Sequence, residues 1–236
     1  MKIKVKEIII IMLLALIGGI LDTFCFKENF NTFCLIQTGN FIKIFVELIN
    51  GNIELGLYSL MIFLVFILGI ILFKVLNTYV FNKTILDKSF INSLILGLLL
   101  IPLIFLEFNS ATIFNVNNVV NSICISLVGS LILVSFSRVG EINFASTMIT
   151  NDTRLMGENL IEGTKEKDKS KLKKTLIYFG ILLVFALGVI STALIIKFVD
   201  DTIRERLILL ILFISIIVII VLNFKIMKEK LWVNIA

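Results

Sequence analysis

The sequence contains no histidine, one proline, one tryptophan and three cysteines, and only 17% of its residues are charged. Without histidine, the chain lacks the commonest proton relay and general base. The cysteines Cys25, Cys34 and Cys124 have no metal-ligand spacing and are interpreted as small apolar packing residues. There is also no Ser–His pair and no phosphate-cradling glycine loop. We therefore predict no enzyme activity, no cofactor and no metal site.

Polar residues are scarce as well. Hydrophobic residues make up 58% of the 236 positions, and the mean hydropathy is +1.07. A soluble domain of this size needs more polar surface. No Pro- or Gly-rich linker divides the chain, so we predict a single membrane domain, 1–236, with the lipid bilayer as its partner. The net charge of +5 lies between apolar segments rather than in a basic patch with exposed aromatics, which argues against a nucleic-acid partner.

Six apolar stretches are long enough to cross a bilayer, which takes about 20 residues of helix. The first lacks a small-residue cleavage site and is followed by five more, so we interpret it as a retained helix and not as a signal peptide. Pro102 predicts a kink in the third. The predicted spans are 8–26, 55–73, 89–106, a region within 108–137, 175–196 and 207–224.

The basic residues predict the direction of these spans. Alternate loops on one side hold 17 of the 22 lysines and arginines. By the positive-inside rule, this distribution predicts a multi-pass protein of the inner (cytoplasmic) membrane with both termini in the cytoplasm. The loop 197–206 is a mild exception, because its three basic residues face the other side.

An internal repeat follows from two shifts of the chain. A shift of 112 residues aligns Thr38 with Thr150, and a shift of 119 aligns Gly69 with Gly188. The predicted repeats are 1–112 and 113–236. Because each holds three spans, the second enters the membrane from the opposite side, as in many secondary transporters. The fold class is thus all-α, with about six transmembrane helices in two inverted three-span repeats.

Each repeat adds one short segment, 41–51 and 153–163, too short and too charged to span the membrane. We predict that both are re-entrant or broken helices, which membrane proteins tolerate where protein or a water-filled cavity surrounds them. Polar residues come just before or at the start of each segment. Discontinuous helices of this kind often build transporter sites.

The first polar start contains the only glutamine of the chain and comprises Gln37, Thr38, Gly39 and Asn40. Thr38 is predicted as a helix N-cap, Gly39 permits close approach, and the amides of Gln37 and Asn40 donate and accept hydrogen bonds. Free N–H groups at such a start favour anions or carbonyl oxygens. Two interpretations remain open: contact with a small-molecule or ion substrate, or a capped helix packed on its neighbour.

The second polar start supplies Thr147, Thr150, Asn151 and Asp152 as further predicted substrate ligands. Asp152 and Arg154 are two residues apart, so on a helix they point in different directions. The alternative is a helix-start carboxylate together with an interfacial basic residue.

Asp22 is the most informative single residue, because a carboxylate late in an apolar span is costly. We predict that it binds a proton or cation and couples that ion to transport. The alternative is a hydrated carboxylate near the outer boundary. The aligned position of the second repeat is Val134, so the acid is not shared between the repeats.

Three motifs resemble the YoaK-like family of bacterial inner-membrane proteins, which carry a domain of unknown function. They are Gly18-Gly19-x-x-Asp22, Phe33-x-x-x-Gln37-Thr38-Gly39-Asn40 and Ala145-Ser146-Thr147-Met148-x-Thr150-x-x-x-Arg154. The resemblance implies six or seven spans and a role as a candidate transporter, with no established substrate. The chain departs from the family at Asn151 and Asp152, where the usual residues are Gly and Asn.

The expected function is a small-solute secondary transporter or permease that works by alternating access. The alternative is a passive channel or a non-transporting scaffold of the same fold. Gly18, Gly19, Gly69 and Gly188 predict close helix packing, and small-residue faces also permit a homodimer.

Overall fold

The computed structural model describes residues 5–33, 35–84, 86–106, 112–139, 142–143 and 149–235, without the side chains of 139, 143, 201, 202 and 231–235. The fold is all-helical, as predicted, apart from one short antiparallel pairing of β1 (Arg138–Val139) with β2 (Ile142–Asn143). The first half contains α1 (Val5–Glu28), α2 (Gln37–Ile49), α3 (Ile53–Val75), η1 (Leu76–Val80), η2 (Phe81–Lys83), α4 (Lys88–Leu99) and α5 (Pro102–Phe105). The second half contains α6 (Val116–Ser135), α7 (Ile149–Lys165), α8 (Lys169–Phe198) and α9 (Asp201–Ile235).

Six helical segments within the described residues are long and apolar enough to cross a membrane, which confirms the predicted number of spans. Their outer faces agree with a lipid environment, because α8 exposes a row of large apolar side chains along much of its length. A helix facing water would carry charged residues there. The six segments are α1, α3 with η1 and η2, α4 with α5, α6, α8, and the part of α9 from Ile203 to Lys230.

Pro102 divides the third span, as predicted. α4 ends at Leu99, and α5 begins with Pro102 in its first turn. Proline has no N–H and its ring clashes with the carbonyl four residues earlier, so the α-helical ladder cannot continue through it. The chain tightens instead, with the N–H of Ile101 donating to the carbonyl of Leu98 at 3.2 Å.

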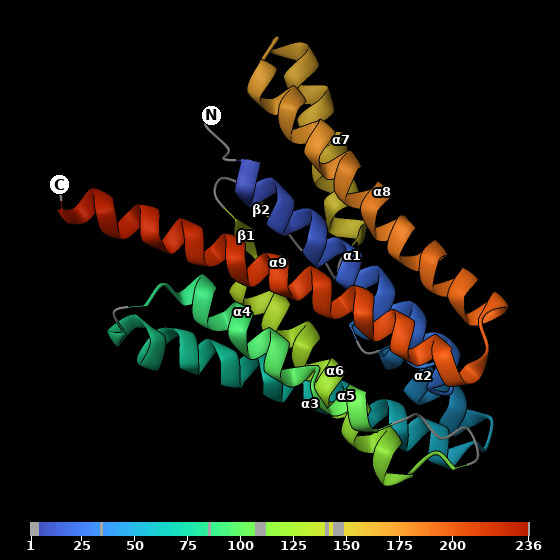
Figure 1. Ribbon diagram of the computed structural model, residues 1–236. Helices are drawn as coiled ribbons and strands as arrows, with labels where there is room; N and C mark the ends of the chain where they lie inside the picture. The colour runs from blue at the N-terminus through green and yellow to red at the C-terminus, as the bar shows by residue number, and fades with distance from the viewer. Residues whose placement is uncertain are drawn as a thin grey trace.

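The helices form two groups that are visible in Figure 1. In the first, α1 packs along α8 and α9, and α7 packs along α8. In the second, α3 packs along α6 and α2, and α4 packs along α6. The groups meet where α4 contacts α9. Helix α1 begins and α9 ends at the same end of the bundle, and the α7–α8 hairpin extends beyond it there (Figure 1).

Glycines allow the helices to approach closely at the principal crossings, which confirms the predicted packing role for Gly19, Gly69 and Gly188. A Cβ added to Gly188 of α8 would lie 2.6 Å from the carbonyl oxygen of Leu16 in α1. A Cβ on Gly19 would lie 3.1 Å from the backbone nitrogen of Val189. In the other group, a Cβ on Gly69 of α3 would collide with the side chain of Ser130 in α6. In lipid, such contacts supply much of the attraction between helices.

We expect Gly188→Ala to destabilise the protein, because the new methyl group meets fixed backbone and not a movable side chain. Overpacking of this kind costs about 1–3 kcal/mol. Gly157→Ala in α7 is the matched control, since a Cβ there has open space around it. Thermal unfolding in detergent should show a clear loss for Gly188→Ala and no loss for Gly157→Ala. Equal stability of the two variants would contradict the close approach of α1 and α8 at Gly188.

Candidate functional site

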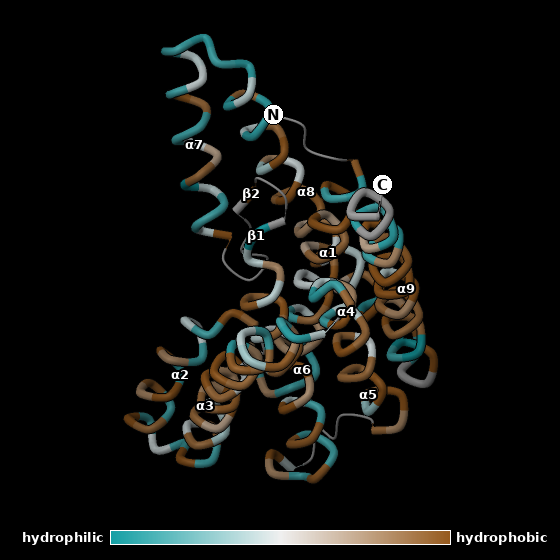
Figure 2. Tube along the Cα trace, turned by 90° about the vertical axis from the view of Figure 1, so that its left-hand side faces the viewer, coloured by the Kyte–Doolittle hydropathy of each residue, from teal (hydrophilic) through white to brown (hydrophobic). Residues whose placement is uncertain are grey.

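A cavity of about 780 Å³ lies between the first turns of α2 and α7 and is completed by α3. Figure 2 shows α2 and α7 on the same side of the molecule, one below the other. Binding pockets for small molecules usually fall between about 300 and 1,000 Å³. The described residues that line the cavity are Leu35, Ile36, Gln37, Thr38, Phe41, Phe63, Phe66, Ile149, Thr150, Asn151 and Arg154.

The structure thus brings the two polar helix starts to one cavity. Gln37 and Thr38 line it from α2, and Thr150 and Asn151 line it from α7. Of the other predicted ligands, Gly39, Asn40 and Asp152 are not among the lining residues, and Thr147 lies outside the described residues.

The prediction that Thr38 is an N-cap is wrong, because Ile36 is the N-cap residue and Gln37 is already helical. No side chain of α2 caps this helix. The backbone before it is instead held from α1. Asp22 Oδ1 accepts a hydrogen bond from the N–H of Leu35 at 2.9 Å and from that of Ile36 at 3.4 Å. A carboxylate beside a helix N-terminus is also electrostatically favourable.

Asp22 is only 4% exposed, so its carboxylate is not hydrated at the protein surface. It lies behind the cavity wall, since Leu35 and Ile36, to which it is bonded, line the cavity while Asp22 does not. Its carboxyl group therefore holds the start of α2 in position. Its role in ion coupling stays a prediction.

Asn40 is fully buried and serves the backbone of the α1–α2 connection. Its Oδ1 accepts from the N–H of Phe33 at 2.9 Å, and its Nδ2 donates to the carbonyl of Phe33 and, at 3.1 Å, to Gln37 Oε1. Gly39 is needed for the same contact, because an added Cβ would lie 2.7 Å from the Phe33 ring. For these two residues, the structure favours the packing interpretation, while Asn40 also orients Gln37.

The prediction that Asp152 and Arg154 diverge on α7 is confirmed. Asp152 is fully buried and lies near Tyr178 of α8. Arg154 is exposed at the cavity, where it donates to Glu158 Oε1 at 2.8 Å and to Asn151 Oδ1 at 3.1 Å. The guanidinium therefore fixes the orientation of the Asn151 amide.

Residues 10–222 match the family model described as a protein of unknown function, DUF1275. The chain belongs to the DUF1275 family. No curated protein and no solved structure is significantly similar to it.

A buried polar network in this DUF1275 protein escaped the sequence prediction. Tyr58 of α3 donates its hydroxyl to Asn29 Oδ1 at 2.8 Å, and Asn29 Nδ2 donates to Ser122 Oγ of α6 at 2.7 Å. The carbonyl of Asn118 lies 3.1 Å from the same hydroxyl. The only signal in the sequence was polar residues within apolar stretches, and nothing there shows that they meet. The network joins the end of α1 to the second helix group.

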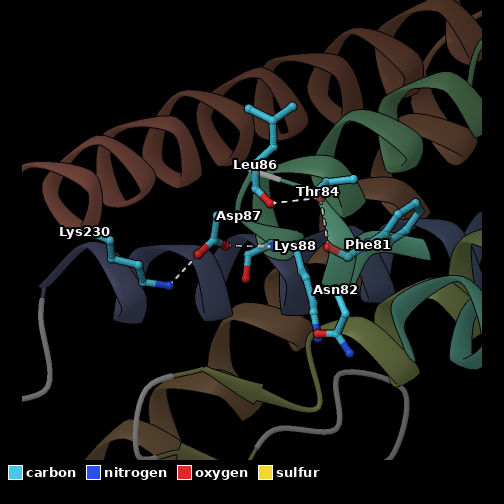
Figure 3. A pocket seen from close by; sticks show the side chains of 8 residues that line it. Phe81, Asn82, Thr84, Leu86, Asp87, Lys88 and Lys230 are labelled. Atoms are coloured by element: carbon cyan, nitrogen blue, oxygen red, sulfur yellow. Dashed lines mark hydrogen bonds and ion pairs between the residues drawn. The ribbon is translucent and has the colours of Figure 1, made fainter. Parts of the chain in front are cut away.

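A polar hollow of about 370 Å³ at the start of α4 is the second notable cavity of the DUF1275 protein (Figure 3). Asp87 is its central charge. Asp87 Oδ1 caps α4 by accepting from the N–H of Ser89 at 2.9 Å, and Asp87 Oδ2 pairs with Lys230 of α9 at 2.5 Å. These bonds bring α4 and α9 together, so we assign the hollow a structural role. The described residues contain no cluster of three or more metal-ligating side chains.

The DUF1275 protein should lose stability when the Asn40 amide is removed. Asn40→Ala leaves the backbone groups of Phe33 buried without these partners, which costs about 1–3 kcal/mol. Asn52→Ala is the control, because its bond to Glu47 is exposed. Thermal unfolding in detergent should separate the two variants, and equal melting temperatures would contradict the anchoring role.

A pH-dependent contribution to stability is expected at Asp87. Burial raises the pKa of this carboxyl, but the Lys230 ammonium and the Ser89 N–H outweigh burial, so the pKa lies below its ordinary value. The stabilisation is therefore present above the unfolded pKa, about 4, and is lost as the pH falls through the lower folded value. The contribution is at most about 1 kcal/mol, because Lys230 is largely exposed.

Asp87→Asn keeps a residue that caps helices well but removes the charge. The melting temperature of this variant should therefore fall less than that of the wild type between about pH 6 and pH 3. Asp168→Asn is the control, because Asp168 caps α8 in the same way, by accepting from the N–H of Ser170 at 2.7 Å, and forms no ion pair with the described residues. If the melting temperature of Asp87→Asn falls as much as that of the wild type, the ion pair does not contribute to the pH dependence of stability.

Proposed function

We propose that this DUF1275 protein is a secondary transporter of a small solute that works by alternating access between two inverted halves. The observation that carries the proposal is the cavity between two short helices, to which each predicted repeat contributes a helix start. Thr38 and Thr150, aligned by the repeat, both line it. The positive-inside bias favours the inner membrane with cytoplasmic termini, and the YoaK-like resemblance is compatible with the family match.

The packing of the helices supports the inverted repeat. The two shifts relate α1 to α6, α2 to α7, α3 to α8 and α4 to α9. The contact of α1 with α8 then corresponds to that of α6 with α3, and the contact of α2 with α3 to that of α7 with α8. The contact of α1 with α9 likewise corresponds to that of α6 with α4. Two related halves that exchange helices would produce this pattern.

The exchange of helices between the two halves suggests two helix groups that could move as rigid bodies. One body consists of α1, α7, α8 and α9, and the other of α2, α3, α4 and α6. The cavity lies between them, since α7 supplies one wall while α2 and α3 supply the other. Rocking of one body against the other would open the cavity first to one side of the membrane and then to the other, which is the motion that alternating access requires.

Asp22 is well placed to couple an ion to this motion. It belongs to α1 in the first body, whereas its hydrogen-bond donors, Leu35 and Ile36, precede α2 in the second. A charged acceptor holds N–H donors about twice as strongly as a neutral one. Protonation of Asp22 would therefore loosen a link between the bodies at the edge of the cavity.

Cysteine accessibility tests the proposal without knowledge of the substrate. Thr150→Cys is placed in a variant whose native cysteines are replaced, and right-side-out and inverted vesicles are treated with a membrane-impermeant maleimide. We expect a change of pH to increase labelling from one side and decrease it from the other. Asp22→Asn, which keeps an acceptor oxygen but no charge, should abolish this shift while the protein still inserts. Asp200→Asn, in an exposed position, should not.

The alternative functions give other patterns. A passive channel would be labelled from both sides at once, and a non-transporting scaffold would show fixed protection that ignores pH. Either pattern overturns alternating access. An undiminished pH shift in Asp22→Asn would leave the transporter standing but remove Asp22 from the coupling step.

A further inference from the structure

The walls of the cavity differ in chemistry, and the difference specifies a ligand. Phe41, Phe63 and Phe66 line it from α2 and α3. Thr150, Asn151 and Arg154 line it from the first turns of α7. A molecule that fills the space therefore meets aromatic rings on one side and hydrogen-bonding groups on the other.

The aromatic wall, formed by Phe41, Phe63 and Phe66, offers ring contacts to a flat ligand. The rings of Phe41 and Phe63 lie 5.3 Å apart at 49°, and Phe66 is 5% exposed, so the wall is held in place. Phe41 is 48% exposed. Aromatic rings favour offset or edge-to-face contact with other rings at such distances, which adds to the gain from apolar burial.

The polar wall carries a positive charge. Arg154 is the one charged side chain among the described lining residues. Its two hydrogen bonds, to Glu158 and Asn151, use two of the five N–H donors of a guanidinium. The pair with Glu158 is about half exposed, and such pairs are weak. A guanidinium fork matches a planar carboxylate, which it can bind through two parallel hydrogen bonds.

The two buried carboxyl groups near the cavity would not contact an anionic ligand directly. Asp22 and Asp152 both lie behind the wall, and neither lines the cavity. Asp22 is engaged with the backbone before α2, and Asp152 faces Tyr178 of α8. The volume of about 780 Å³ has room for a body of one or two fused rings.

We infer that the cavity binds a small aromatic carboxylate, with its ring against Phe41, Phe63 and Phe66 and its carboxylate on Arg154. The inference rests on the proposed function, since it names the solute class of the same cavity. The ligand must therefore combine an anionic group with a flat ring. Neither an aliphatic cation nor a purely polar anion satisfies both walls.

Three probes with one ring system and different charges test the assignment. They are 2-naphthoate, 2-naphthamide and protonated 2-naphthylmethylamine, titrated calorimetrically into protein in lipid nanodiscs, with empty nanodiscs as the blank. We expect naphthoate to bind at least about tenfold more tightly than the amide, because it adds charge-assisted bonds. The cation should bind least. Tightest binding by the cation, or equal binding by all three, would overturn the inference.

Variants with matched controls locate the site. Arg154→Gln should reduce the affinity for naphthoate to that for the amide, and Arg154→Lys, which keeps the charge without the fork, should fall between. Arg206→Gln, in an exposed position on α9, should change nothing. Phe63→Leu should weaken all three probes, whereas Phe179→Leu on the exposed face of α8 should not. Unchanged naphthoate affinity in Arg154→Gln variants that melt like the wild type would sink the assignment.

The binding experiment is independent of flux, so its failure differs from failure of the proposed function. Naphthoate binding with fixed cavity accessibility would support the ligand class and overturn transport. Alternating accessibility without naphthoate binding would support transport and overturn the ligand class.

Discussion

Backbone polar groups buried in a protein must find partners there, and the structure of this DUF1275 protein depends on how the connection between α1 and α2 meets that demand. Three side chains meet it. Asp22 accepts from the N–H groups of Leu35 and Ile36, Asn40 pairs with both backbone groups of Phe33, and Lys43 donates to the carbonyl of Phe30. Without these bonds, the start of α2 would not be held against α1, and the cavity would lack one of its two polar starts.

The same demand explains why the polar residues of the first motif divide into two sets. Asn40 and Gly39 turn toward the connection and shape it, while Gln37 and Thr38 turn toward the cavity. One turn of helix thus serves both fold and ligand. The second motif divides similarly, with Asp152 buried against α8 and Asn151 and Arg154 at the cavity.

Features set by one segment of chain could be predicted from the sequence. The six spans follow from run length, the break at Pro102 from a missing N–H, and the divergence of Asp152 and Arg154 from helical periodicity. Features that depend on contacts between distant segments could not be predicted from the sequence. The prediction for Thr38 was wrong because its expected role at the α2 start falls to a carboxylate from another helix. The aromatic wall was missed because nothing in an apolar sequence distinguishes Phe63 and Phe66 from phenylalanines that face lipid.

The bonds that cross between the two helix groups differ in kind, and this difference bears on where motion can occur. The Asn29–Tyr58–Ser122 network is fully buried and contains no carboxylate or basic group. The link from Asp22 to the α2 start carries a titratable acceptor and lies directly behind the cavity. Under the proposed function, the neutral network would hold the two groups together throughout the motion, whereas protonation would weaken the links at Asp22 and at the Asp87–Lys230 pair between α4 and α9. A ligand that contacts Gln37 would therefore act first on the hydrogen bond between Asp22 and Leu35, because Gln37 lies two residues beyond Leu35.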